Sequence, residues 1–126
     1  MGSERINRPT SGDITKALLV RLPEQFPCRC WRRNVMAAML PGTPPRFVRS
    51  SALPGEADIT GILRLPSGVG QRIEIEVKAG KDQQSEAQRV FERMIVAHGG
   101  IYLVARDVEQ TLVELRRIVD ALTAKN

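Results

Sequence analysis

Three polar side chains in the middle of the sequence have the types and spacing of a site for metal-assisted hydrolysis. Glu76 and Lys78 stand two residues apart in an alternating segment, so in a β-strand both side chains leave the same face. Asp58 lies in the preceding turn Gly55-Glu56-Ala57-Asp58, and a hairpin can bring it beside them. Two carboxylates with water and phosphate oxygens suit Mg²⁺, and a neighbouring ammonium can stabilise developing charge or help to deprotonate a bound water.

Each of these residues also has a purely structural interpretation. Glu76 and Lys78 could belong to the solvated face of an antiparallel strand, and Asp58 could be an ordinary turn residue. Gln88 fits a capping box with Ser85, in which the glutamine side chain bonds back to the Ser85 backbone N–H. Taken singly, none of these residues decides between a structural and a catalytic role.

A hairpin is predicted around the candidate site. Residues 72–79 alternate between apolar and polar side chains, as a half-buried strand does. Residues 57–65 form a second predicted strand, and the Pro-Ser-Gly-Val-Gly run at 66–70 is typical of the turn between them. The hairpin is the element that would hold Asp58 near Glu76.

Two helices and a strand are predicted after the hairpin. Apolar side chains at helical spacing indicate helices over 85–98 and 108–122, separated by a short apolar strand at 101–105. Gly99 with its glycine neighbour predicts a left-handed cap at the end of the first helix, and Asp107 can cap the start of the second.

The N-terminal part of the chain is expected to be less regular. Asp13 can cap a helix over 13–22 that ends near Pro23, and an extended stretch follows at 28–35. Residues 36–54 contain four prolines and a glycine, which predicts a long loop.

The resulting order, α–β–β–β–α–β–α, predicts an α/β fold of three layers or fewer with a central, partly mixed β-sheet flanked by helices. We expect a flexible tail at 1–12 and a single domain at 13–126, because 126 residues suffice for one core and 42% of them are apolar. No apolar run approaches the ~18 residues that span a bilayer, and the N-terminus is polar, so we expect a cytoplasmic protein without a membrane partner.

The net charge of +5 is concentrated in one segment. Between Gln25 and Gly55 there is no acidic residue, so the other 14 basic residues of the chain's 19 balance all 14 acidic ones. Concentrated arginine indicates a face that binds a polyanion, most simply nucleic acid; a solvated surface is the alternative. The candidate nucleic-acid-binding residues of this segment are Arg29, Arg32, Arg33, Arg46 and Arg49.

Several single residues leave two interpretations open. Trp31 could stack on an unpaired base, but in a chain with 4% aromatic residues we expect it to fill the core. Lys81, just beyond the alternating strand, could touch phosphate or belong to a solvated loop. His98 is expected to end a helix, where the dipole favours partial positive charge. Cys28 and Cys30 are too few for a four-ligand zinc site and are expected to be buried free thiols.

The order and spacing of these features resemble a known family. The segments PGEADITGIL, IEIEVKAG and SEAQRVFERMIVAHGGIYLVARDVE are similar to the VRR-NUC branch of the PD-(D/E)XK nucleases, and Trp31-Arg32-Arg33-Asn34 is similar to a motif upstream in that family. The resemblance implies a restriction-endonuclease-like core and phosphodiester hydrolysis assisted by Mg²⁺ or Mn²⁺, without a small-molecule cofactor.

The resemblance also implies roles for individual residues. Asp58 and Glu76 would be metal ligands, with the Val77 carbonyl as a possible third. Lys78 would lie near the attacking water, and Gln88 would orient Lys78 or that water.

The chain departs from the family at one position. PD-(D/E)XK sites commonly include an acidic residue of the first helix, and here that helix offers Asp13 at its start and Glu24 at its end. Glu74 lies on the correct strand face but two residues from Glu76, so we expect it to lie outside the direct ligand set. Whether the site binds one metal ion or two therefore stays open.

Stand-alone family members of this size resemble homodimeric resolvases of four-way (Holliday) junctions from bacteria and phages. The resemblance therefore implies a structure-specific endonuclease of branched DNA, acting as a homodimer in the cytoplasm of a bacterial or phage-infected cell, because two symmetric cuts need two active sites. RNA as the substrate stays open. The alternative is a nuclease-like module or subunit that binds nucleic acid without cutting it.

Overall fold

The computed structural model describes residues 8–34, 37–49 and 53–124, and for residues 37, 38, 48 and 49 it describes the backbone. Residues 1–7 of the expected flexible tail at 1–12 fall outside the described residues, whereas Ser11 and Gly12 are helical. The elements are α1 (Ser11–Gln25), β1 (Cys28–Arg32), β2 (Ala37–Leu40), β3 (Arg46–Arg49), β4 (Ile59–Arg64), β5 (Gly70–Val77), α2 (Glu86–Ala97), β6 (Ile101–Ala105) and α3 (Val108–Ala124).

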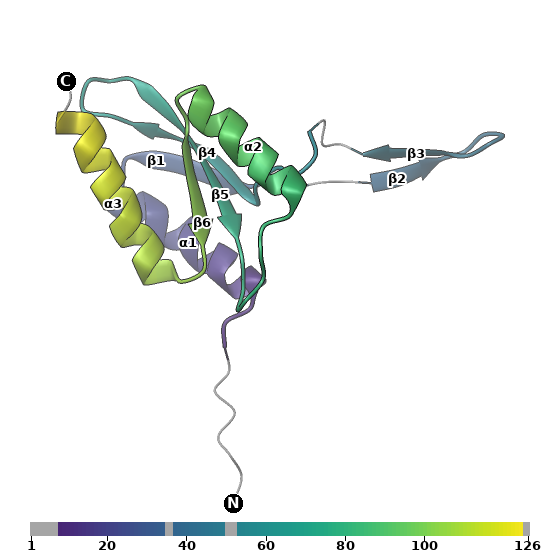
Figure 1. Cartoon of the computed structure of the whole chain (residues 1–126), viewed down its shortest axis with the longest axis horizontal. Coiled ribbons are helices and arrows are strands. Elements are labelled where there is room, and N and C mark those ends of the chain that lie inside the picture. The colour runs from purple at the N-terminus through teal and green to yellow at the C-terminus, as the bar shows by residue number, and fades with distance from the viewer. Residues whose placement is uncertain (1–7, 35–36, 50–52, 125–126) are drawn as a thin grey trace, which may run out of the picture.

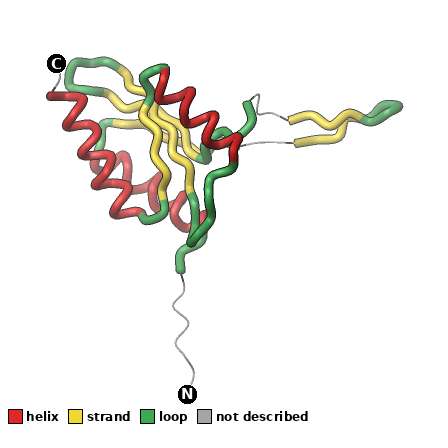
Figure 2. Tube along the Cα trace, viewed as in Figure 1, coloured by secondary structure: helices red, strands yellow, loops and turns green. Residues whose placement is uncertain are grey.

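A four-stranded mixed sheet lies at the centre, in the order β1-β4-β5-β6 (Figures 1 and 2). The β1–β4 and β4–β5 pairs are antiparallel and β5–β6 is parallel, which confirms the partly mixed sheet and the predicted hairpin. Helices α1 and α3 cover one face of the sheet and α2 lies on the other, so the α/β layering is also confirmed.

The alternation of β5 divides its side chains between the two faces. Ile73, Ile75 and Val77 are buried in the large core with α1 and α3, where each such side chain contributes roughly 1.5–3 kcal/mol by leaving water. Glu74 and Glu76 point to the α2 face, which holds a smaller apolar cluster around Phe91 and Tyr102. The strand therefore carries two buried acids away from the main core.

The first helix differs from the expectation at both ends. Thr10, not Asp13, is the N-cap, and Asp13 completes a capping box by accepting a hydrogen bond from the Thr10 backbone, which lowers the Asp13 pKa. Pro23 lies inside the helix, which continues to Gln25. A proline so close to the end removes one backbone donor and leaves the cap bond from Phe26 to Leu22 in place.

The predicted loop at 36–54 is wrong, because it contains a second sheet. Strands β2 and β3 pair antiparallel, with Met39 opposite Phe47 and Leu40 opposite Arg46. Pro41, Pro44 and Pro45 fall between the two strands, where no ladder N–H is needed, so they form the connection without breaking the pairing. Figure 1 shows this hairpin standing away from the central sheet.

The predicted caps of the later helices are confirmed. Ser85 is the N-cap of α2, and Gly99, with φ of 88°, follows its C-cap residue His98. The Asp107 side chain accepts a hydrogen bond from the backbone of Gln110 at 2.9 Å at the start of α3. Of the helices in the described ranges, none has the length and apolar character that crossing a bilayer demands.

Candidate metal and catalytic site

Asp58 and Glu76 meet where β4 begins and β5 ends. Because the two strands run antiparallel, the residue before β4 lies beside the last residues of β5. Asp58 Oδ2 accepts a hydrogen bond from the backbone N–H of Val77 at 2.8 Å, and the Asp58 and Glu76 side chains are close enough to hydrogen-bond. Two carboxylates that are 18 positions apart in the chain thus share one place on the α2 face.

Gly55 allows the turn before Asp58 to reach this place. Its φ is +73°, a conformation that disfavours other residues, and a Cβ there would collide with the backbone of Ala87 and lie 2.6 Å from the Gln88 nitrogen. Glycine therefore lets the turn pack directly against the first turn of α2. The same contact brings Asp58 and Gln88 to one site.

Glu76 is a buried carboxylate with one unsatisfied oxygen. Its side chain is 3% exposed, Oε1 accepts a hydrogen bond from Gln88 Nε2 at 3.1 Å, and Oε2 has no hydrogen-bond partner among the described residues. Burial, followed by the hydrogen bond and the charge of Asp58, raises the pKa of Glu76 from 4.5 to about 8, while the charge of Lys78 lowers it.

Gln88 takes part in two interactions that the sequence presents as alternatives. Its Oε1 accepts a hydrogen bond from the Ser85 backbone N–H at 2.8 Å, which completes the capping box of α2. Its Nε2 donates to Glu76 in the same arrangement. The amide has both a donor and an acceptor, so the structural role and the contact with the site coexist.

Lys78 follows Glu76 on the same strand face. Its backbone N–H donates to the Ala105 carbonyl at 3.0 Å, so the extended pairing with β6 continues past the end of β5. The alternation places the Lys78 side chain beside Glu76, in agreement with its effect on the Glu76 pKa. In the described part of the chain, no side chain forms an ion pair with its ammonium.

The donor set fits a divalent cation. Two neighbouring carboxylates repel each other, and a cation between them would remove the repulsion and satisfy Glu76 Oε2. Within the described ranges, no group of three or more His, Cys, Asp or Glu side chains is arranged to hold a metal ion. Asp58 and Glu76 would supply two side-chain ligands, and these roles, like that of the Val77 carbonyl as a third ligand, stay predictions.

Glu74 belongs to an ion-pair network next to the site. It is fully buried, and Arg33 Nη1 and Arg72 Nε lie 3.0 and 3.2 Å from its oxygens. The Thr60 hydroxyl also donates to it. Arg33 in addition donates from its backbone to the Asp58 carbonyl at 2.7 Å, so it links β1, β5 and the turn that carries Asp58.

Neither acid of the first helix joins Asp58 and Glu76. Asp13 is occupied in the α1 capping box, and Glu24 is exposed and lies 4.0 Å from Arg21. Helix α1 packs on the sheet face opposite to the one that carries Glu76. Neither residue therefore supplies the first-helix acid that PD-(D/E)XK sites commonly include.

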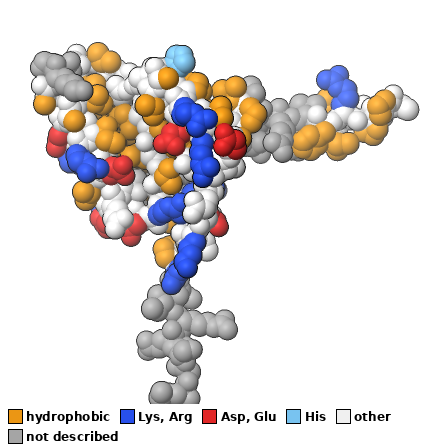
Figure 3. Space-filling model, viewed as in Figure 1, with side chains coloured by type: hydrophobic (Ala, Val, Ile, Leu, Met, Phe, Trp, Pro, Cys, Tyr) orange, Lys and Arg blue, Asp and Glu red, His pale blue; other side chains and the backbone are white. Residues whose placement is uncertain are grey.

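The predicted nucleic-acid-binding residues separate into two kinds. Arg29, Arg32, Arg46 and Lys81 are exposed. Figure 3, which draws one face of the molecule, shows a broken band of Lys and Arg side chains running toward the N-terminal end. Arg33 is 15% exposed and turned inward to Glu74. Of Arg49 the backbone alone is described.

The expectation that Trp31 fills the core is wrong. Its side chain is 52% exposed, because β1 is an edge strand and the buried side chains of α2 pack on Tyr102 of β6 and on Ala57 instead. Cys28 and Cys30 are free and half-buried, packed against the large core. His98 is exposed at the end of α2, with Nδ1 2.8 Å from the Met94 carbonyl oxygen.

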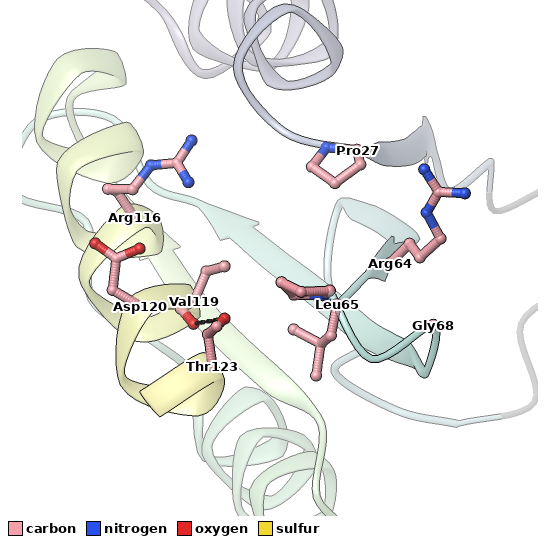
Figure 4. A pocket seen from close by; sticks show the side chains of 9 residues that line it. Pro27, Arg64, Leu65, Gly68, Arg116, Val119, Asp120 and Thr123 are labelled. Atoms are coloured by element: carbon pink, nitrogen blue, oxygen red, sulfur yellow. Dashed lines mark hydrogen bonds between the residues drawn. The ribbon is translucent and has the colours of Figure 1, made fainter. Parts of the chain in front are cut away.

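A separate pocket of about 450 Å³ lies between α3 and the turn that joins β4 to β5 (Figure 4). Arg64, Arg116 and Asp120 are its charged residues. Arg64 ends β4, whereas Asp58 precedes its start, so this pocket lies at the other end of the strand. We do not assign it to the chemistry of Asp58 and Glu76.

No protein-family model matches the chain, and no curated protein matches it.

Proposed function

We propose that the protein is a divalent-metal-dependent endonuclease that hydrolyses phosphodiester bonds of DNA. The observation that carries the proposal is the buried Glu76 with its unsatisfied oxygen beside Asp58, flanked by Lys78 on the same strand face. A mixed four-stranded sheet between helices is compatible with the restriction-endonuclease-like core that the resemblance implies.

Asp58 and Glu76 would hold Mg²⁺ or Mn²⁺. When bound, such an ion supplies Lewis-acid polarisation of a phosphate oxygen and a lowered pKa for a water molecule. Gln88 fixes Glu76 through Oε1 and leaves Oε2 available as a ligand. The Lys78 ammonium can stabilise negative charge on the phosphate or orient the attacking water.

The proposed substrate is branched DNA such as a four-way junction, and the proposed assembly is a homodimer. The exposed side chains of Arg29, Arg32, Arg46 and Lys81 support binding to a phosphate backbone. Two-fold symmetry would supply the two active sites that paired cuts require.

A nucleic-acid-binding module without cleavage is the second candidate. The observation in its favour is that the described residues offer two carboxylates and no third side-chain ligand. In that case Asp58 and Glu76 would bind a cation for stability rather than for catalysis.

Cleavage of a labelled four-way junction and of a linear duplex, each with Mg²⁺, Mn²⁺ or EDTA, tests the proposal. We expect paired, metal-dependent cuts in the junction, absent in Asp58→Ala and retained in Asp120→Ala on α3. Cutting of every substrate would support the proposed nuclease activity and contradict the proposed structure specificity. Binding without cleavage by the folded protein would favour the second candidate.

A further inference from the structure

Part of the sheet face that carries the site is not covered by any helix of the described ranges. Helix α2 packs through Phe91 and Ile95 on Tyr102 of β6 and on Ala57. Toward β1 the same face is open, and Trp31 and Ile62 are 52% and 51% exposed. We call this region, formed by Arg29 and Trp31 of β1, Ile62 and Arg64 of β4 and Arg72 of β5, the open sheet face.

Strand register places Trp31 in line with the site. Trp31 pairs with Thr60, and Thr60 pairs with Glu74, so the three residues form one row across the sheet. Neighbouring strands are about 4.8 Å apart, which puts the Trp31 backbone roughly 10 Å from that of Glu74. Glu76 is two residues further along β5. The indole therefore lies close enough to the two carboxylates for one nucleic-acid strand to contact both.

The open sheet face is basic. Arg29 and Arg64 are exposed and form no ion pair with another residue in the ranges described, and Arg72 reaches Glu74 with Nε while its side chain is 57% exposed. Glu74, the acidic residue of the row, is fully buried. Charge complementarity therefore favours an anionic ligand over an apolar ligand or a protein surface with few acidic residues.

The face also has a shallow hollow two residues along β1 from Trp31. The hollow, of about 610 Å³, is lined by Arg29, Ile62, Arg64, Gly68 and Gly70, among others, while Trp31 lies outside it. Guanidinium groups beside an exposed indole and an apolar floor suit a strand whose phosphates contact arginine while a base contacts the ring. A paired base within a duplex does not present its flat face, so the arrangement favours an unpaired one.

We propose that the open sheet face binds a nucleic-acid strand with an unpaired base stacked on Trp31. The inference rests on the proposed nuclease function for the position of the cut, and it deepens that function by naming the substrate class. Strands with unpaired bases close to the cleavage point, as at forks and junctions, would be preferred over continuous duplex.

Trp31 is the sole tryptophan of the chain, so intrinsic fluorescence reports on it directly. The experiment titrates the full chain in EDTA, which prevents cleavage, with an oligo(dT) strand, a forked duplex and a blunt duplex. Anisotropy of labelled DNA measures binding independently. We expect quenching by the strand and the fork and little change with the blunt duplex.

Substitutions separate stacking from general contact. Trp31→Ala should weaken binding of the fork about five- to 150-fold, the range of one lost base–aromatic stack, and leave blunt-duplex affinity nearly unchanged. Trp31→Phe should restore part of the affinity, and Trp31→Leu, which is apolar but not aromatic, should not. Val113→Ala, on the exposed side of α3, is the matched control.

Unchanged fluorescence at saturating DNA, equal fork affinity of Trp31→Ala, or no nucleic-acid binding by the folded protein would overturn the inference. Quenching with the expected loss in Trp31→Ala, but no cleavage when Mg²⁺ is added, would leave the inference standing and reject the nuclease.

Discussion

At the scale of single residues, Glu76 links stability to pH. Because the folded state raises its pKa from 4.5 to about 8, the folded protein keeps a proton that the unfolded chain releases. Stability from this group is complete below about pH 4.5 and is lost as the pH rises to about 8. We therefore expect the melting temperature of the metal-free protein to fall over this interval.

Glu76→Gln should flatten this dependence and make the metal-free protein more stable than the wild type at pH 8. Mg²⁺ should stabilise the wild type at that pH and have little effect on the variant. Thermal unfolding across pH, with and without Mg²⁺, measures both effects. Glu114→Gln, at an exposed position of α3, is the control; a wild-type slope in Glu76→Gln would contradict the buried-charge explanation.

Gln88 allows its two interactions to be separated. Ser85→Ala and Gln88→Ala each remove part of the capping box, so both should destabilise the protein by about 1 kcal/mol. Gln88→Ala alone also removes the hydrogen bond to Glu76, so it should reduce metal-dependent cleavage well beyond Ser85→Ala. Urea unfolding and cleavage rates measure the two effects. Equal rates in the two variants would limit Gln88 to the cap.

At the scale of elements, the turn at Gly55 and the start of α2 form one unit. Gly55→Ala adds a Cβ against the backbone of Ala87 and Gln88 as well as the strain of a positive φ. Gly80→Ala, where φ is +58° and the space is open, adds the strain alone, about 1 kcal/mol. We expect Gly55→Ala to be the more destabilising in urea unfolding and to lose metal binding; equal costs would contradict the close approach.

The helices and central strands could be predicted because each follows an uninterrupted apolar pattern. The β2–β3 hairpin could not, because prolines dominate the segment 36–54 and its short strands contain little periodicity. Asp58 and Glu76 could be selected as candidates from their side-chain chemistry and spacing, whereas the site role of Gln88 is implied by the resemblance to the VRR-NUC nucleases. The inward turn of Arg33 and the exposure of Trp31 could not, because both depend on which strand lies at the sheet edge and how far α2 extends.

At the scale of the whole molecule, the arginine-rich segment is divided between two places. Arg29 and Arg32 lie on β1 of the central sheet, and Arg46 lies on the β2–β3 hairpin, which Figure 1 shows apart from that sheet. A nucleic acid that contacts both would extend well beyond the two carboxylates. The basic residues that account for the net charge of +5 are thus spread over a longer surface than their close spacing in the sequence indicates.

Arg46→Ala tests the hairpin's part in binding. Loss of one phosphate contact should reduce the slope of log affinity against log salt by about 0.9, without changing stability, because the side chain is exposed. Affinity measured at several salt concentrations gives the slope, with Arg117→Ala on α3 as the control. An unchanged slope would remove the hairpin from the interface.

The capping box of α2 affects how much of the time the site is complete. Helix ends open and close far more often than whole proteins unfold, and Gln88 contacts Glu76 from the first turn of α2. Each opening of that turn would withdraw the amide and release the carboxylate. The fraction of molecules with a complete site at any moment is therefore limited by the local closing equilibrium of one helix turn, and hydrogen exchange at the Gln88 amide would report it.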